Sequence, residues 1–171
     1  MLAGRSFGRC LGKTVCQTSP RAEPAGSLCG AAKSAPMIGA MGYQVADASK
    51  VEWAERPPAV EGQAPRLAAD VTSAAGLQNS RGRVWRYPAG TRGRRHADKA
   101  QEEVFVVISG RLTMLLGDPY ERIDVGPESV VAVEPGTPLQ VRNESDEELV
   151  LYIYGAPPEQ GGADFFDDVE L

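Results

Sequence analysis

The sequence has few of the residues that build disulfides or multi-histidine sites. Its three cysteines, Cys10, Cys16 and Cys29, all lie in the first 36 of 171 residues. His96 is the only histidine in the chain. The part after residue 36 therefore uses neither disulfides nor thiolate chemistry. One subunit also cannot supply a metal site built from two or three imidazoles.

Long apolar runs and an excess of positive charge are also missing. The longest apolar runs cover only a few residues, such as 104–108, whereas a membrane-spanning helix needs roughly 18. Residues 37–171 carry 13 basic and 22 acidic side chains, a balance that repels phosphate backbones. We therefore expect a cytoplasmic protein whose partners include neither a membrane nor a nucleic acid.

Residues 1–36 differ from the rest, with five basic residues against one acidic and no apolar periodicity. A secretory signal needs an apolar stretch of roughly 7–15 residues, which this segment does not supply. A transit peptide, a disordered extension and translation from Met37 or Met41 remain open. We favour the last two over targeting, so residues 1–36 are predicted to be a disordered or mis-assigned extension.

The remaining chain has the composition of one folded domain, with 42% hydrophobic and 24% charged residues overall. From residue 83 onward, short β-branched and aromatic runs alternate with Gly, Pro, Asp and Asn, which is typical of an all-β sandwich or barrel. Closing such strands into a jelly roll removes most exposed edges. The pattern predicts strands at 83–88, 94–97, 103–109, 111–116, 120–124, 129–134, 139–142 and 148–154.

The same pattern sets the expected domain boundaries. We predict a barrel over 83–155, preceded by an arm at 37–82 that packs on it and followed by an acidic tail at 156–171. A weak strand signal near 51–54 lies within the arm, and a strand of residues 43–56 could join two copies into a homodimer. Ser109 and Gly110 separate two apolar runs and predict a tight hairpin, because glycine accepts a positive φ.

Two segments resemble the motifs of the cupin family. The first, G-x5-H-x-H-x3,4-E-x6-G, is matched at four of its five fixed positions by Gly90, His96, Glu103 and Gly110, with Asp98 at the fifth. Residues 128–143 are similar to the second motif and match it at Gly136 and Asn143. The resemblance covers about 83–155 and implies an all-β, cupin-type double-stranded β-helix (jelly-roll) barrel with one pocket.

The resemblance also implies where a metal would bind. In the family, two histidines and a glutamate of the first motif and a histidine of the second hold a metal ion. Their equivalents here are His96, Asp98, Glu103 and Leu139. Leucine has no donor atom, so we expect no tightly bound metal, and Leu139→His should restore one. The alternative is a manganese, iron or zinc ion held by His96, Asp98 and Glu103.

Strand alternation assigns side chains to the pocket. Glu102 and Glu103 must face opposite sides, and the resemblance to the motif implies that Glu103 is the inward one, which makes it a candidate general acid or base together with His96. Arg94 should share the face of His96 and pair with the carboxylate of Glu103 or of a ligand, whereas Arg95 faces away. A hydrogen-bonded structural role for His96 and a surface role for the arginines remain open.

Two hypotheses for function follow. In the first, the barrel holds a small organic molecule against Arg94 and the apolar side chains of Trp85, Tyr87, Phe105 and Leu139. In the second, the protein resembles the cupin oxygenases and isomerases and uses either a reduced metal site of His96, Asp98 and Glu103 or an acid/base pair of Glu103 and His96. The fold alone does not choose between them, because cupins carry many chemistries.

Overall fold

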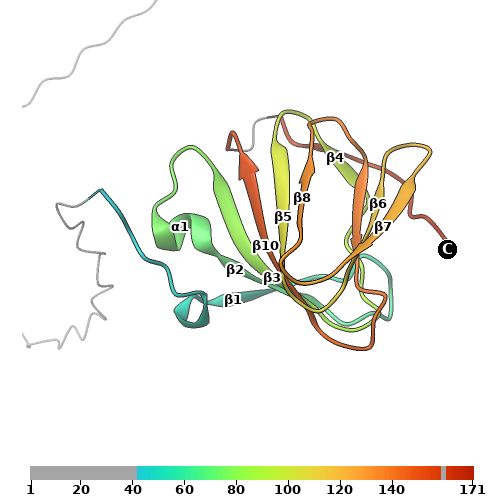
Figure 1. The fold of residues 1–171 in the computed structure, drawn as a ribbon, viewed down its shortest axis with the longest axis horizontal. Helices are drawn as coiled ribbons and strands as arrows, with labels where there is room; N and C mark the ends of the chain where they lie inside the picture. The colour runs from blue at the N-terminus through green and yellow to red at the C-terminus, as the bar shows by residue number, and fades with distance from the viewer. Residues whose placement is uncertain (1–41, 159–160) are drawn as a thin grey trace, which may run out of the picture. The chain divides into compact units, whose positions relative to one another are not determined.

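The computed structural model describes residues 42–158 and 161–171 (Figure 1). The expectation for residues 1–36 lies outside these residues. A 3₁₀ turn, Ala48–Lys50, and one short helix, α1 (Val71–Ala75), accompany eleven strands. The strands are β1 (Trp53–Arg56), β2 (Arg66–Asp70), β3 (Arg81–Tyr87), β4 (His96–Asp98), β5 (Glu102–Ser109), β6 (Leu112–Leu116), β7 (Glu121–Val125), β8 (Val130–Val133), β9 (Leu139–Arg142), β10 (Leu149–Ala156) and β11 (Ala163–Phe165).

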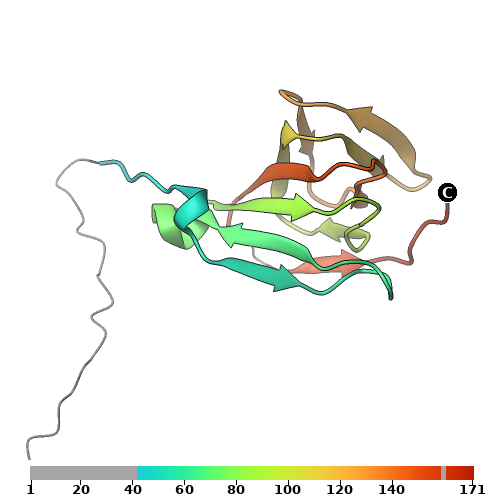
Figure 2. The ribbon, with the colours of Figure 1, turned by 90° about the horizontal axis from the view of Figure 1, so that it is seen from below.

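The strands form two antiparallel sheets. The larger has the order β1-β2-β3-β10-β5-β8 and the smaller the order β11-β4-β9-β6-β7. Figure 2 shows β1, β2, β3 and β10 side by side in the larger sheet. Neighbours in space are often distant in sequence: β10 lies between β3 and β5, and β9 between β4 and β6. This is the double-stranded β-helix, or jelly-roll, that the sequence predicts.

All eight predicted strands are present, and their ends differ from the prediction by at most two residues. The structure adds β2 and β11, which the sequence pattern did not indicate, and extends the weak signal near residue 53 into β1. β1 pairs with β2 of its own chain, so part of the expected arm belongs to the larger sheet. The homodimer stays a prediction.

The connection at Gly110 is not the hairpin that the sequence suggested. β5 and β6 lie in different sheets, so the chain crosses from one sheet to the other here. Gly110 has a φ of 82°, and a Cβ at this position would lie 2.5 Å from the carbonyl oxygen of Glu148. A glycine is therefore required both by backbone conformation and by close packing. The hairpin of this region joins β6 to β7 instead.

The helix α1 fixes the beginning of β3. The side chain of Asp70 accepts a hydrogen bond from the backbone N–H of Thr72, which caps the helix. The hydroxyl of Thr72 in turn accepts a hydrogen bond from Gly82 N and donates one to Gly82 O. Gly82 is the second residue of β3, so these contacts hold the part of the strand that carries Arg81 and Arg83.

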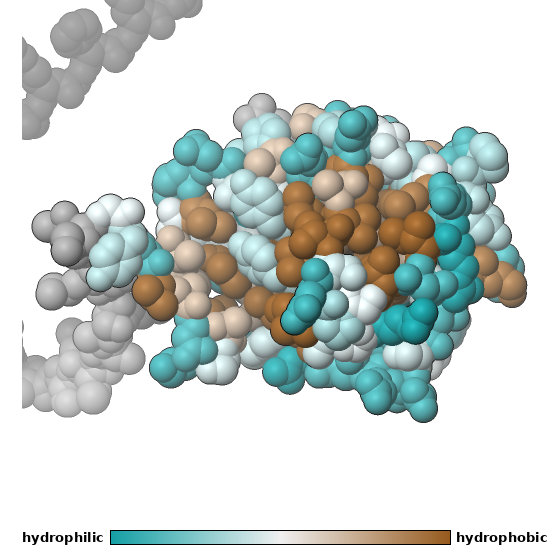
Figure 3. Space-filling model, in the orientation of Figure 1, coloured by the Kyte–Doolittle hydropathy of each residue, from teal (hydrophilic) through white to brown (hydrophobic). Residues whose placement is uncertain are grey.

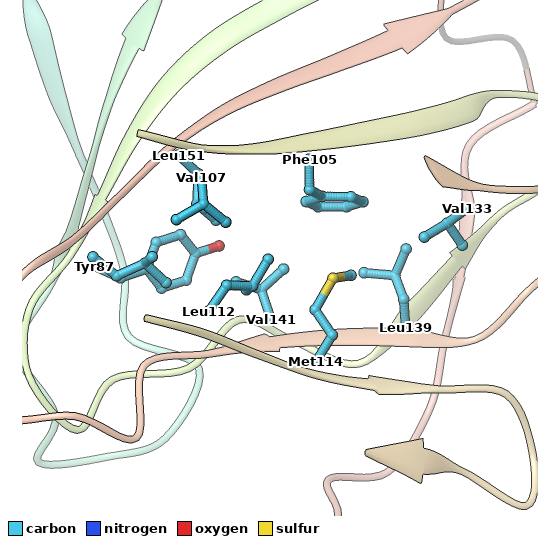
Figure 4. Packing of buried hydrophobic residues seen from close by; sticks show 10 residues of the cluster. Tyr87, Phe105, Val107, Leu112, Met114, Val133, Leu139, Val141 and Leu151 are labelled. Carbon is cyan, nitrogen blue, oxygen red and sulfur yellow. The ribbon is translucent and has the colours of Figure 1, made fainter. Parts of the chain in front are cut away.

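The hydrophobic core lies between the two sheets (Figure 4). Along β5 the alternation is as predicted, since Glu103 and Phe105 are buried and Glu102 is exposed. The buried cluster consists of Tyr87, Phe105, Val107, Leu112, Met114, Val133, Leu139, Val141, Leu149 and Leu151.

The outer face of the larger sheet is also partly apolar. Figure 3 shows apolar side chains gathered over β5, β8 and β10, where Ile108 and Val130 are among the exposed hydrophobic residues. No helix within residues 42–158 and 161–171 combines the length and the apolar character needed to cross a bilayer.

Candidate functional site

A cavity of about 260 Å³ opens into the barrel beside the core. Its walls come from both sheets and include inward-facing residues of β3, β4, β5, β10 and β11. The lining side chains are both charged and aromatic: Arg66, Arg81, Arg83, Trp85, Tyr87, Arg94, His96, Asp98, Glu103, Phe105, Val141, Ile153, Ala163 and Phe165, with Gly93 and Gly155.

Strand β3 provides one complete wall. Arg81, Arg83, Trp85 and Tyr87 all line the cavity, as the period of two along a strand requires. Trp85 and Tyr87 were expected here from the sequence, whereas Arg81 and Arg83 were not. The signal was present, because the two arginines continue the same alternation toward the beginning of the strand.

Arg81 joins the two buried carboxylates of the cavity. Its Nη2 atom lies 3.4 Å from Asp98 Oδ2 and 3.2 Å from Glu103 Oε1. Both carboxylates are almost completely buried, with 4% and 5% of their residue surface exposed. Carboxylates at this depth need a compensating positive charge. Arg81 supplies it, which is the role that the sequence analysis had offered to Arg94.

His96 lies next to the same carboxylate pair. Its Nδ1 atom is 3.0 Å from the carbonyl oxygen of Arg94, and Nε2 is 3.4 Å from Glu103 Oε2. Burial lowers the pKa of His96, but the Glu103 carboxylate, the Arg94 carbonyl and the charge of Asp98 outweigh it and raise the pKa above its usual value. Because both ring nitrogens face oxygen atoms, this environment favours the protonated ring.

The expected metal ligands do not fit a metal ion. The Arg81 guanidinium bridges Asp98 and Glu103 where a cation would have to lie. The Nδ1 atom of His96 faces the carbonyl oxygen of Arg94, and Nε2, the nitrogen left to bind a metal, faces Glu103 Oε2 instead. Within the described part of the chain, no three His, Cys, Asp or Glu side chains are grouped in a way that could hold a metal ion.

Leu139 does not line the cavity, contrary to the expectation from sequence. It pairs with His96 across β4 and β9, so its backbone is in the expected place. Its side chain is only 1% exposed and packs in the core near Met114 and Val133 (Figure 4). The position that carries the second-motif histidine in the family is therefore used here for hydrophobic packing.

Arg94 lines the cavity as predicted but has a different neighbour from the one expected. Its guanidinium carbon lies 3.8 Å from the ring centroid of Phe165, a cation–π contact. It forms no ion pair with any residue in 42–158 or 161–171. Arg95 turns away and donates a hydrogen bond to Gly117 O. The alternation predicted for this segment is confirmed.

The C-terminal residues were expected to form an acidic tail, yet three of them form β11. Ala163, Asp164 and Phe165 pair with Asp98, Ala97 and His96 of β4. Ala163 and Phe165 contribute to the cavity wall. A three-residue strand with an acidic centre has too little pattern to be recognised from sequence, and Phe165 was therefore missed.

Comparison with known proteins relates this fold to a known family. The family model described as "Cupin domain" matches residues 83–154. A search of curated proteins found no significant match. Many solved structures share the fold.

Three of these structures illustrate how varied the named proteins with this fold are. The polyketide cyclase RemF from Streptomyces resistomycificus has a TM-score of 0.62 at 13% identity, covering 74% of this chain and 87% of its own. A putative sugar phosphate isomerase from Acidithiobacillus ferrooxidans has a TM-score of 0.57 at 17% identity, with coverages of 72% and 90%. A predicted oxalate decarboxylase from Thermotoga maritima has a TM-score of 0.58 at 12% identity, with coverages of 67% and 99%. Identities this low show a common fold only.

Proposed function

Because residues 83–154 form a small cupin domain, we propose that the barrel binds a small organic molecule in its cavity without a tightly bound metal ion. The observation that carries this proposal is the position of Arg81, whose guanidinium lies between the carboxylates of Asp98 and Glu103. The permanent positive charge of Arg81 compensates the two carboxylates, as a bound metal ion would otherwise do.

Electrostatics supports the same conclusion. A divalent cation entering between Asp98 and Glu103 would meet the permanent charge of Arg81, which cannot be removed by deprotonation. The ion would have to displace a guanidinium that already makes two charge-assisted contacts, and it would gain no ligand from Leu139 in return.

The cavity suits an organic ligand in size and in lining. About 260 Å³ is close to the lower end of the roughly 300–1,000 Å³ usual for ligand pockets. Trp85, Tyr87, Phe105 and Phe165 provide an apolar wall, and a few charged groups are placed among them. This combination is typical of sites in which apolar contacts give affinity and polar groups fix the orientation.

Metal analysis of protein purified without an affinity tag tests the proposal. We expect trace amounts of manganese, iron and zinc, and weak binding of Mn²⁺ and Zn²⁺ in calorimetric titrations. About one equivalent of any of these metals per chain, or micromolar affinity in the wild type, would contradict it. That result would favour the metal-dependent oxygenase or isomerase built on His96, Asp98 and Glu103.

Variants at Arg81 make the test sharper. Arg81→Gln removes the competing charge and should raise the affinity for Mn²⁺ about tenfold, because the two buried carboxylates lose the guanidinium that contacts both of them. Arg86→Gln is the matched control, since Arg86 belongs to the same strand but does not line the cavity. Leu139→His should gain little, alone or together with Arg81→Gln, because the side chain at this position packs in the core and does not line the cavity.

A further inference from the structure

We propose that the ligand of this cavity is a compact organic anion, with a carboxylate or phosphate group bound by Arg66 and Arg94 and a flat apolar body against the aromatic wall. This inference rests on the proposed function and narrows it to one chemical class. It follows from the balance of charge in the cavity, the surroundings of two arginines and the shape of the apolar wall.

The cavity carries an excess of positive charge in an otherwise acidic protein. Within residues 42–158 and 161–171, four arginines and two carboxylates, those of Asp98 and Glu103, line it, whereas the whole chain has a formal charge of −5. Both carboxylates already contact Arg81. Among the described residues, neither Asp98 nor Glu103 forms an ion pair with Arg66 or Arg94, so these two guanidiniums add positive charge to the cavity.

Arg66 is held in place mainly by neutral groups. Its Nη2 atom donates to the carbonyl oxygen of Pro57, and its guanidinium lies 5.6 Å and 5.5 Å from the ring centroids of Trp85 and Tyr87. The Nε atom is buried and has no hydrogen-bond partner in the part of the chain that the structure describes. A half-buried guanidinium with a buried, unpartnered Nε atom is stabilised when an anion binds beside it.

Arg94 is the second arginine of the proposed anion site, and its chain neighbour Gly93 lies close to Arg66. A Cβ added at Gly93 would lie 3.3 Å from Arg66 Nη1, so the Arg66 guanidinium approaches the residue directly before Arg94. One face of Arg94 is stacked on Phe165, while the residue as a whole is exposed. Stacking orients a guanidinium plane and leaves its N–H edge available for a bidentate contact with a carboxylate or phosphate.

The rest of the wall excludes a simple inorganic ion as the preferred ligand. Trp85, Tyr87, Phe105 and Phe165 surround the cavity together with Val141 and Ile153. A hydrated ion would leave this apolar surface exposed to water, whereas a single planar ring would cover it. A cavity of about 260 Å³ has room for a ring with one charged substituent.

The experiment compares three probes that share one ring: benzoate, phenyl phosphate and benzyl alcohol. Binding is measured by calorimetry and by chemical-shift titration with the full chain. We expect at least one of the two anions to bind about tenfold or more tightly than benzyl alcohol, as one charge-assisted contact requires. The tighter of the two identifies the acid group as carboxylate or phosphate. Inorganic phosphate and acetate should bind more weakly than the corresponding ring compounds.

Variants assign the effect to the two arginines. Arg66→Gln and Arg94→Gln should each weaken binding of the preferred anion about tenfold and leave benzyl alcohol unchanged. Arg86→Gln, on the outer side of β3, should alter neither. Arg94→Lys keeps the charge but loses the planar fork, so it should recover only part of the affinity. Circular dichroism and thermal unfolding show whether each variant keeps the wild-type fold.

The possible failures can be told apart. Equal binding of benzyl alcohol and the anions, undiminished anion binding in both glutamine variants, or no binding of any anionic probe overturns the anion proposal. The metal content of the same preparation decides the proposed function separately. A metal-free protein that prefers the neutral probe would keep a small-molecule site and lose only the anionic class of ligand.

Discussion

The two halves of the barrel interior are built by the same strands but serve different purposes. β10 enters the core with Leu149 and Leu151 and then lines the cavity with Ile153 and Gly155. β3 runs the opposite way, with Arg81 at the cavity and Tyr87 at the border of the core. Alternation along a strand decides only which side chains point inward. The change from apolar to charged residues along the strand sets the boundary between the hydrophobic core and the cavity.

The largest expected effect is a loss of stability that differs between the core end and the cavity end of β10. Leu151→Ala should lower the free energy of unfolding by about 3 kcal/mol, because it leaves a void in a closed core. Ile153→Ala, two residues further on the same face, should cost clearly less since that side chain already borders an open cavity. Chemical denaturation measures both. Equal losses would mean that the cavity end is packed as tightly as the core.

The next largest effect on stability is expected at the charged residues that line the cavity. Arg81→Gln should cost about 2 kcal/mol, because the buried carboxylates of Asp98 and Glu103 lose the guanidinium that contacts both of them. Glu103→Gln in the same chain should recover part of this loss, since only one carboxylate then remains to be compensated. A double-mutant cycle from unfolding curves gives the coupling energy. A coupling near zero would show that Arg81 contacts Glu103 without stabilising it.

The strands and their inward faces could be predicted from the sequence, but much of the site could not. Glu103 and Phe105 were assigned correctly because β5 is long and strictly alternating. Leu139 was placed in the pocket by its motif position, and the structure buries it because a leucine without a metal to bind gains more from the core. Arg81 lies before the matched motifs and Phe165 after them. The motifs therefore give no sign that either residue lines the cavity, and this is seen only in the folded structure.

The smallest expected effect lies outside the barrel interior, at the cap that fixes β3. Burial raises the pKa of Asp70, but hydrogen bonds from Ser73 and Thr72 outweigh it and lower the pKa below the usual 3.8. A lowered pKa in the folded state stabilises the protein above the unfolded-state pKa, and this stabilisation is lost as the pH falls through the folded-state value. Asp70→Ala should therefore cost about 1 kcal/mol at neutral pH.

Unfolding curves at several pH values test this prediction. The difference between wild type and Asp70→Ala should be constant from neutral pH down to mildly acidic conditions and should shrink only at the acid end, below 3.8. A difference that already disappears near neutral pH would assign the effect to another group.

The short strand β11 links the proposed ligand binding to the docking of residues 163–165 on β4. It contacts β4 through three residue pairs, and its Phe165 forms part of the cavity wall beneath Arg94. A molecule that rests on Phe165 gains affinity only while the strand is docked. By thermodynamic reciprocity, the docked state must then gain the same free energy from the bound molecule. In this proposal, ligand binding in the cavity and the docking of β11 on β4 are thermodynamically coupled.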